Sequence, residues 1–265
     1  MSLTANGKAT LTTAAPQEEI TIRRATLLDG PDVGKAAATA YFSTPLTSWI
    51  SPRREKYPAA YQRGFFERAV TRILSPRNET YVACLSSPEG KIVGAAQFVR
   101  LGDDAGARKM IRDVGLVRRV LFWVLSWGFW AWCQVWWLFQ GGDKSIDREA
   151  VETFAAWCRV DQGRFWEGRE ERVNRWHAQS VVVLPEWQGR GIGKRLMAEV
   201  LRRAERDGAM VGLESSVKGE GLYRRLGFEL LGRFTTQADA MEGGDKGGVM
   251  AWYPEGWKER HSGES

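Results

Sequence analysis

The chain has 265 residues, of which 43% are hydrophobic and 26% charged, which suits one globular domain of generous size or a domain with an insertion. Its 38 Lys and Arg residues outnumber its 32 Asp and Glu residues, and the resulting net charge of +6 suits an anionic ligand; no basic run with interleaved aromatic residues indicates a nucleic-acid partner. Three cysteines without a CxxC pair or histidine spacing indicate neither a disulfide framework nor a zinc site, so we expect a reduced, cytoplasmic location.

The N-terminal part of the chain predicts a strand, two helices and a hairpin. Alternating apolar residues predict the first strand over 20–26, and helical spacing predicts helices over 33–42 and 52–74. Two further runs, 80–85 and 91–99, flank a turn that contains Pro and Gly, and they predict the second and third strands.

An insertion over about 102–175 separates this hairpin from the next convincing strand, which begins near Trp176. Residues 120–139 of the insertion hold six tryptophans and three phenylalanines, and only Ser126 and Gln134 are plainly polar. A helix of this length, about 30 Å, could cross a bilayer. A single span would, however, place strands that should be neighbours in one sheet on opposite sides of a membrane. Three roles stay open: a lid or wall over the protein's own site, a dimer interface, or peripheral membrane contact.

Because residues 120–139 are apolar nearly all round the helix, we expect burial on several sides. The charged segment 147–175 that follows carries apolar residues at helical spacing, and it predicts an amphipathic helix.

The stretch from Ser180 to Phe228 carries the strongest signal. An apolar strand around Val181, Val182 and Val183 leads into a glycine-rich turn that opens a helix, and such a helix start gathers unpaired N–H groups and the positive end of the helix dipole. This arrangement predicts a pyrophosphate site made by residues 188–194. Its members are Gln188, Gly189, Arg190, Gly191, Ile192, Gly193 and Lys194. The spacing fits neither a dinucleotide fingerprint nor a P-loop, and a turn that merely tolerates glycine is the structural alternative.

A second signal, Gly221-Leu-Tyr-Arg-Arg-Leu-Gly-Phe228, predicts a helix that a glycine ends before a new strand. Together, Gln-x-x-Gly-x-Gly and Tyr-x-x-x-Gly-Phe resemble the GNAT superfamily of acetyl-CoA-dependent N-acetyltransferases. The wording Val-x-Leu-Pro-x-x-Gln-Gly-x-Gly-Ile-Gly, with Leu-Glu-Ser-Ser at 213–216, is most similar to fungal members. The resemblance covers about a fifth of the chain with high specificity.

The resemblance implies an α/β GNAT fold: a mixed, mostly antiparallel sheet whose fourth and fifth strands splay apart, here with the Trp-rich helical insertion between the third and fourth strands. It also implies acetyl-CoA as co-substrate, with the pantetheine arm on the backbone of residues 181–183 and the pyrophosphate on the glycine turn. Direct attack by an amine needs no protein nucleophile and no metal.

Two residues near the second signal are candidates on the cofactor side. Tyr223, four residues before Gly227, stands where many family members carry the tyrosine that protonates the leaving thiolate; a tyrosine that only packs its helix on the sheet is the alternative. Many relatives have an Asn about seven residues earlier that bonds the cofactor arm. Here that position is Ser216, whose hydroxyl could substitute.

The general base is open between His177, Glu214 and ordered water. His177 starts the fourth strand, where some relatives carry a carboxylate, and it is the histidine outside the tail of the chain. Strand alternation would place it on one face with Gln179, Val181 and Val183. Glu214, at the end of the fifth strand, is the second candidate, with a cap or ion-pair partner as its structural interpretation.

We expect the domain to span 20–253, between a disordered leader over 1–19 and a polar tail over 254–265, with a mobile glycine-rich loop over 235–248. The expected function is acetyl transfer from acetyl-CoA to a primary amine of a small apolar or aromatic molecule, because the insertion would supply an aromatic wall. Two alternatives remain: acetylation of a protein N-terminus or lysine, and a CoA-binding interaction protein with little catalysis that docks through the insertion.

Overall fold

The computed structural model describes residues 19–86, 90–234 and 247–261, and a seven-stranded mixed sheet runs through them. Its order is β1-β2-β3-β4-β5-β7-β6, and all neighbouring strands are antiparallel except β4 and β5, which are parallel. The strands are β1 (Ile20–Arg24), β2 (Asn78–Leu85), β3 (Ile92–Arg100), β4 (Arg175–Val183), β5 (Met210–Ser215), β6 (Glu229–Arg233) and β7 (Gly248–Trp252). The strands predicted over 20–26, 80–85 and 91–99 and from near Trp176 are therefore confirmed, with shifts of at most two residues at their ends.

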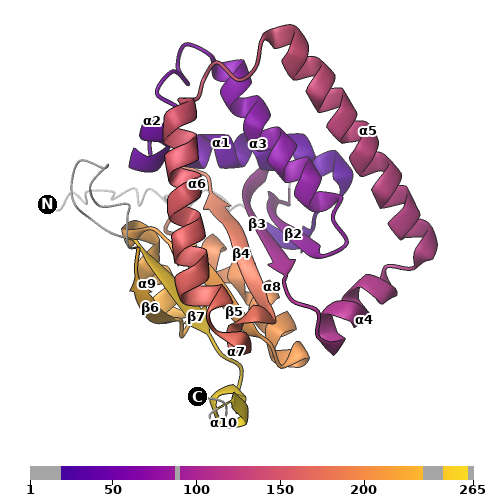
Figure 1. The fold of residues 1–265 in the computed structure, drawn as a ribbon, viewed down its shortest axis with the longest axis vertical. Helices are drawn as coiled ribbons and strands as arrows, with labels where there is room; N and C mark the ends of the chain where they lie inside the picture. The colour runs from indigo at the N-terminus through magenta and orange to yellow at the C-terminus, as the bar shows by residue number, and fades with distance from the viewer. Residues whose placement is uncertain (1–18, 87–89, 235–246, 262–265) are drawn as a thin grey trace, which may run out of the picture.

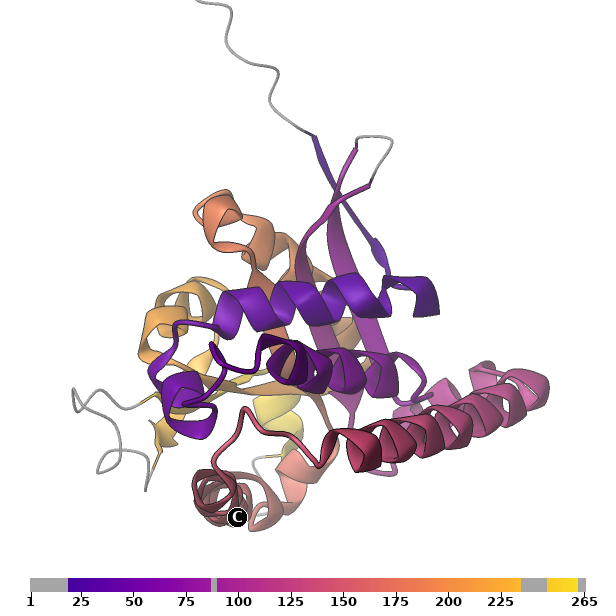
Figure 2. The same ribbon diagram turned by 90° about the horizontal axis from the view of Figure 1, so that it is seen from above.

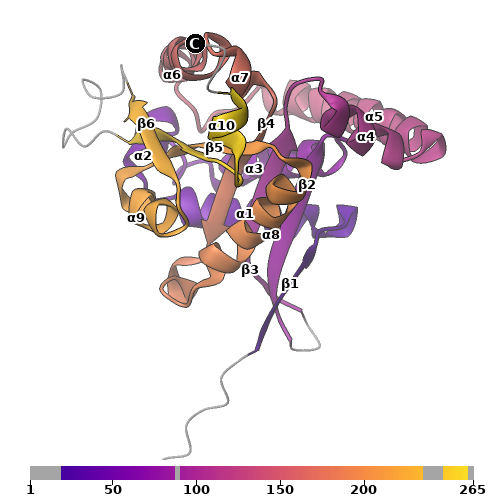
Figure 3. The same ribbon diagram turned by 90° about the horizontal axis from the view of Figure 1, so that it is seen from below.

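Helices cover both faces of the sheet (Figure 3). On one face lie α1 (Gly30–Tyr41) and α3 (Pro58–Ile73), joined through the short α2 (Pro45–Ile50); on the other face lies α8 (Ile192–Asp207). The short α9 (Val217–Arg225) connects β5 to β6. The sequence predicts one helix over 52–74, but α3 begins at Pro58, where the fixed φ of proline suits a first helical position, and α2 was not predicted.

The core divides between the two faces. Leu196, Met197 and Val200 of α8 are at most 1% exposed and pack with Val211 and Leu213 of β5. On the opposite face, Val33 and Ala37 of α1 pack with Ala69 of α3 and with Val82 and Val182 of the sheet. These apolar contacts hold β4 between two helical layers, so its backbone has a fixed position.

A β-bulge at Gln179 changes the faces of β4. Gln97 of β3 pairs with Ser180 while Phe98 pairs with Ala178, so Gln179 has no partner of its own in the β3 ladder. Val181 and Val183 consequently pack toward α8 with the larger core cluster, whereas His177 lies on the other face. The expectation that His177 shares a face with Val181 and Val183 is wrong, because the extra residue reverses the alternation.

The two parallel strands separate just before this bulge. Pairing between β4 and β5 covers only Arg175 to Ala178 on β4 and Met210 to Leu213 on β5. From Gln179 onward none of the described strands pairs with β4 on that side, while β5 continues along β7. This is the splay that the resemblance implies, and it leaves β4 backbone groups open toward the gap.

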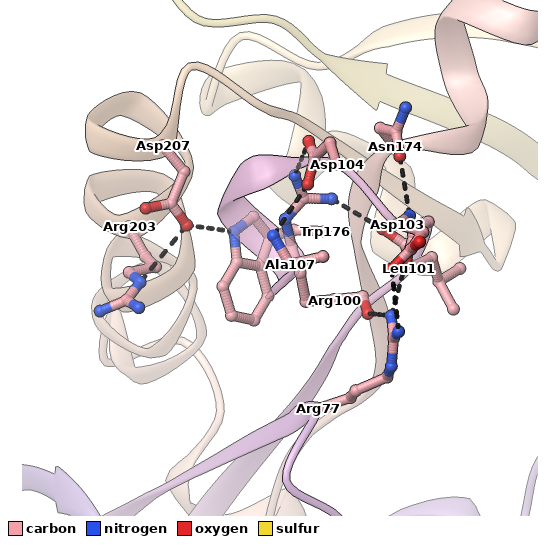
Figure 4. A network of polar contacts seen from close by, with 11 residues as sticks. Arg77, Arg100, Leu101, Asp103, Asp104, Ala107, Asn174, Trp176, Arg203 and Asp207 are labelled. Atoms are coloured by element: carbon pink, nitrogen blue, oxygen red, sulfur yellow. Dashed lines mark hydrogen bonds and ion pairs between the residues drawn. The ribbon is translucent and has the colours of Figure 1, made fainter. Parts of the chain in front are cut away.

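The insertion between β3 and β4 leaves and rejoins the sheet at one point (Figure 4). Arg77 donates to the carbonyl oxygen of Gly102 over 2.6 Å, and the Asn174 side chain accepts from the backbone N–H of Asp103 over 3.1 Å. Arg100, 1% exposed, pairs with Asp104. Because these contacts join both ends of the insertion to the sheet, its helices are held as part of the same body.

The insertion comprises α4 (Ala105–Asp113), α5 (Leu116–Gln140), α6 (Arg148–Gln162), the π-helical turn η2 (Gly163–Glu167) and α7 (Glu170–Val173). In Figure 1, α6 crosses in front of the sheet while α5 runs outside α3. The predicted helix over 120–139 and the amphipathic helix within 147–175 are confirmed. The expected burial of α5 on several sides is wrong, because Cys133 is its one buried residue and most of its surface faces outward.

Three sequence expectations fall largely outside the described residues: the leader, the loop over 235–246 and the last four residues. Within the expected tail, Trp257–His261 forms the helix α10, and Trp257 is 7% exposed in a cluster with Phe165 and Val249.

Candidate active site

The glycine turn after β4 lies at the uncapped start of α8. Gly189 and Gly191 have φ angles of 77° and 75°, and a Cβ built on either would meet no atom within 4 Å. Gly191 is the N-cap residue and no side chain caps the helix, so the first N–H groups of α8 are left without an intrahelical partner. A positive φ, open space and free N–H groups together form a cradle that fits a phosphate group.

The side chains of the turn take different positions. Gln188 donates to the carbonyl oxygen of Val183 over 3.1 Å and so ties the turn to the end of β4. The Arg190 guanidinium lies 4.4 Å from the centre of the Trp187 ring, and Lys194 is exposed. Arg195 instead donates to the Ile20 carbonyl oxygen over 2.7 Å. Arg190 and Lys194 are thus the basic side chains of the turn that could reach an anion.

Two other members of the predicted turn have packing positions. Ile192 is 2% exposed in the core below the turn. A Cβ on Gly193 would lie 3.1 Å from Leu222 of α9, so this glycine permits the close approach of α8 and α9.

The open edge of β4 starts at the bulge. Ser180 there shares a 3.3 Å hydrogen bond with the hydroxyl of Tyr41, the last residue of α1. Beyond it, residues 181–183 pair with β3 on one side and have no strand on the other. A slender chain with amide groups could therefore add its hydrogen bonds along this edge.

Tyr223 of α9 belongs to the apolar cluster against which Val181 and Val183 of β4 pack. It is 9% exposed, its ring packs edge-on against Phe228, and no described residue accepts a hydrogen bond from its hydroxyl. Burial raises the pKa of Tyr223, and the neighbouring phenol of Tyr41 raises it further. The phenol therefore keeps its proton through the neutral range, which is the state a proton donor requires.

Ser216 is the N-cap residue of α9. Its hydroxyl oxygen accepts from the backbone N–H of Gly219 over 3.2 Å, and its side chain is exposed. A hydroxyl that accepts one hydrogen bond still has its own proton to donate. Ser216 can thus cap α9 and bond a ligand at the same time.

His177 of β4 and Glu214 of β5 form a hydrogen-bonded pair at the end of the parallel ladder. His177 Nε2 lies 2.8 Å from Glu214 Oε2, and the other carboxylate oxygen accepts from the Trp166 indole N–H over 3.0 Å. Arg175 Nε faces His177 Nδ1 at 3.5 Å, which makes Nδ1 the acceptor and Nε2 the protonated nitrogen. The structure therefore brings together both base candidates of the sequence.

Trp166 and Arg175 complete this cluster. The Trp166 ring lies over Gly212, where a Cβ would come within 2.4 Å of it, and the Arg175 guanidinium lies 4.2 Å from the ring centre. Neither residue was singled out by the sequence, because a π-helical turn between α6 and α7 brings Trp166 there. The Gly in the apolar run of β5 was a signal of close approach.

The electrostatics keep the carboxylate ionised. Burial would raise the pKa of Glu214, but the electrostatic interaction and hydrogen bond with His177, the hydrogen bond from the Trp166 indole and the charge of Arg175 outweigh it, so the pKa of Glu214 lies below its usual range. Burial lowers the pKa of Arg175 to about 10, against the charges of Glu214 and Glu167, so its guanidinium stays charged at neutral pH. The Glu214 side chain is 41% exposed and the His177 side chain 13%, so the carboxylate is the outer member of the pair.

An open pocket of about 550 Å³ reaches β4 at Gln179, on the face that carries His177. Its wall comes from α3, from Trp137 at the end of α5 and from the loop that follows; the lining residues are Gly64, Glu67, Arg68, Thr71, Arg72, Trp137, Asp143 and Gln179. The insertion therefore contributes one aromatic side chain, Trp137, to this pocket. Most of its tryptophans face elsewhere.

Comparisons with known proteins agree with this geometry. Residues 143–230 match the model of the acetyltransferase (GNAT) domain family. No curated protein matches the chain.

Solved structures give the extent of the likeness. The "histone acetyltransferase HPA2 and related acetyltransferase" of Corynebacterium glutamicum has the same fold, with 21% identity, 89% of this chain and 96% of that chain covered, and a TM-score of 0.54. A polyamine N-acetyltransferase of Drosophila melanogaster is similar at 20% identity over 89% of this chain and 100% of that one, with a TM-score of 0.47. PaiA N-acetyltransferase of Thermoplasma acidophilum, solved with coenzyme A, shows 11% identity over 89% and 99% of the chains, with a TM-score of 0.45.

Proposed function

We propose that the chain is an acyl-CoA N-acyltransferase of the GNAT superfamily and that it transfers the acetyl group of acetyl-CoA directly to a primary amine of a small molecule with an apolar or aromatic body. The observation that carries the proposal is the separation of β4 from β5. The uncapped start of α8 lies beyond one end of this opening, and the His177–Glu214 pair lies at the other end.

The donor half fits acetyl-CoA. The cradle at Gly189 and Gly191, where a Cβ would occupy open space, suits the pyrophosphate, with Arg190 and Lys194 beside it. The open edge over 181–183 suits the amides of the pantetheine arm, and Ser216 has a hydroxyl proton to offer it. Acetyl-CoA supplies a thioester whose carbonyl carbon an amine can attack.

The chain's own residues handle the protons. As the amine nitrogen bonds to the acetyl carbon and the C–S bond breaks, Tyr223 donates its phenolic proton to the departing sulfur. The His177–Glu214 pair takes the proton that the amine loses, directly or through a water molecule. Because the pKa of Glu214 is lowered, the accepted proton resides on the His177 imidazole and not on the carboxylate. It binds Nδ1, so the 3.5 Å hydrogen bond from Arg175 Nε to Nδ1 must break.

The acceptor body is assigned to the pocket at Gln179. Trp137 gives it an aromatic wall, which supports an apolar or aromatic amine, while Arg68 and Arg72 provide cationic groups on another wall for an acidic substituent. Glu67 is already engaged by Arg63 and by the Trp137 indole N–H, at 2.7 and 2.9 Å.

Release of free thiol from acetyl-CoA over a panel of amines tests the proposal. The panel contains aromatic amines with and without a carboxylate, aliphatic amines, and peptides with a free N-terminus or lysine. Turnover with peptides in preference to every small amine would replace the proposed acceptor class.

A further inference from the structure

Helix α5 exposes an unusually large apolar surface. Trp123, Trp127, Trp130 and Trp132 are 63%, 55%, 54% and 48% exposed, and Leu138 and Phe139 near its C-terminal end are 80% and 83% exposed. Exposed apolar surface on this scale marks a site of contact with another body rather than ordinary surface.

The helix is fixed in place by its opposite side. Cys133 is 5% exposed, Phe129 packs edge-on against Phe66 of α3 at 5.7 Å, and the Trp137 indole N–H bonds to Glu67 over 2.9 Å. The Arg63 guanidinium lies 3.8 Å from the centre of the Trp132 ring. The residues of α5 that are buried or partly buried are Phe122, Ser126, Phe129, Cys133, Trp136 and Trp137. At 3.6 residues per turn they take up less than half of the helix circumference. The remaining apolar arc therefore stays outside the folded body (Figure 2).

Positive charge collects beside this arc. Residues 105–119 contain five cationic side chains and one acidic one; the cations are Arg108, Lys109, Arg112, Arg118 and Arg119, and the acid is Asp113. Arg108 pairs with Asp103 over 3.2 Å. The sequence of α5 contains no Asp or Glu. An apolar tryptophan face bordered by an excess of cations is complementary to a surface that is apolar inside and anionic outside.

The shape of the arc separates the candidate partners. A second copy of this chain would cover only one strip of α5, as in coiled coils. Because the apolar arc is wider than half the circumference of the helix, the rest of the arc would stay exposed to water. Among the described residues no single helix is long and apolar enough to cross a bilayer; α4 and α5 satisfy those criteria only together, and they meet at a bend of 86°. A helix lying in the plane of the membrane avoids both difficulties, and tryptophan favours that interfacial depth.

We propose that α5 lies in the headgroup region of an anionic lipid bilayer, parallel to its surface, with its tryptophan arc in the lipid and the cations of α4 and the start of α5 against the phosphates. Arg118 and Arg119 lie at the first turns of α5, where long side chains can reach back to the headgroups. This membrane contact concerns where the enzyme works and is independent of the chemistry at His177 and Tyr223.

Co-sedimentation of the full chain with vesicles tests the proposal. We expect binding to phosphatidylcholine vesicles that contain about a quarter phosphatidylserine, weak binding to pure phosphatidylcholine, and release as salt screens the charges. Replacing Trp123, Trp127 and Trp130 by Ser should lower the bound fraction about tenfold or more, as should Lys109→Glu with Arg112→Glu. Matched controls are Leu28→Ser with Val160→Ser, exposed apolar positions elsewhere, and Arg206→Glu with Arg225→Glu; both should bind like the parent chain.

A measurement on the unaltered chain guards against a variant that misfolds. Lipids brominated near the headgroup should quench its tryptophan fluorescence more strongly than lipids brominated deep in the acyl chains. Equal quenching at both depths, absence of binding to anionic vesicles, or a stable dimer in solution that the triple Trp→Ser variant converts to a monomer would each overturn the proposal. Thiol release with a soluble amine should be unchanged in the triple variant, so the two proposals fail separately.

Discussion

His177 and Glu214 lie 2.8 Å apart between Nε2 and Oε2, at the end of the parallel ladder of β4 and β5. His177 pairs with Gly212 on the next-to-last rung, and Glu214 directly follows Leu213, the last residue of β5 that pairs with β4. β4 thus contributes His177, and β5, which follows α8, contributes Glu214. Glu214 is at the same time fixed by Trp166 over 3.0 Å, so the carboxylate is held from two directions.

Replacing His177 by Ala should flatten or displace the acidic limb of the rate–pH profile and lower turnover by roughly 100-fold. Because the pKa of Glu214 is lowered, this carboxylate stays ionised as the pH falls through the neutral range, so the acidic limb tests the proton-accepting role proposed for His177. The profile of kcat against pH measures this. A limb that keeps its position and slope in the variant would exclude His177 as the base.

Replacing Tyr223 by Phe should lower kcat by roughly 100-fold or more while the Kd of acetyl-CoA changes little. The ring packing against Phe228 is kept, and the lost hydroxyl makes no hydrogen bond to a described residue, so the fold should be unaffected. Steady-state kinetics and calorimetry separate the two effects. Unaltered turnover would leave Tyr223 a packing residue.

Replacing Gly191 by Leu should abolish acetyl-CoA binding and leave the protein folded. A side chain there would fill the open cradle, and the positive φ would add strain of about 1 kcal/mol. Gly115→Leu is the matched control, because Gly115 has a φ of 76°, similarly open space and an N-cap position, but at α5. Calorimetry that finds normal acetyl-CoA binding in Gly191→Leu would contradict the pyrophosphate assignment.

Replacing Trp137 by Ala should raise the KM for aromatic amines by about tenfold, equivalent to about 1.4 kcal/mol, with a smaller change in kcat. Trp137 lines the pocket at Gln179, whereas Trp130 on the same helix faces outward and is 54% exposed. Trp130→Ala should therefore leave the KM unchanged. Equal effects of the two substitutions would remove Trp137 from the acceptor pocket.

The positions of the strands along the chain and of the glycine turn could be predicted because they depend on local patterns. Alternation, glycine positions and the Tyr-x-x-x-Gly-Phe segment are all readable within about ten residues. The bulge at Gln179 could not be predicted, since it arises from the pairing of β4 with β3. Because of this bulge, Val181 lies on the face of the sheet opposite His177.

The surroundings of the predicted site residues depend on contacts far apart in the sequence. Trp166 reaches Glu214 across 48 positions, and Tyr41 reaches Ser180 across 139. The outward direction of α5 has the same origin. Its composition predicts a helix and apolar contact, but only the packing of Phe129 and Cys133 on α3 decides which side faces out.

The most direct test of the account is the stoichiometry of CoA release and amide formation with acetyl-CoA and the amine panel. We predict one free thiol for each N-acetylated small amine found by mass spectrometry, fastest with an aromatic amine and about 100-fold or more slower in Tyr223→Phe. Binding of acetyl-CoA without thiol release for any amine or peptide on the panel would contradict the account.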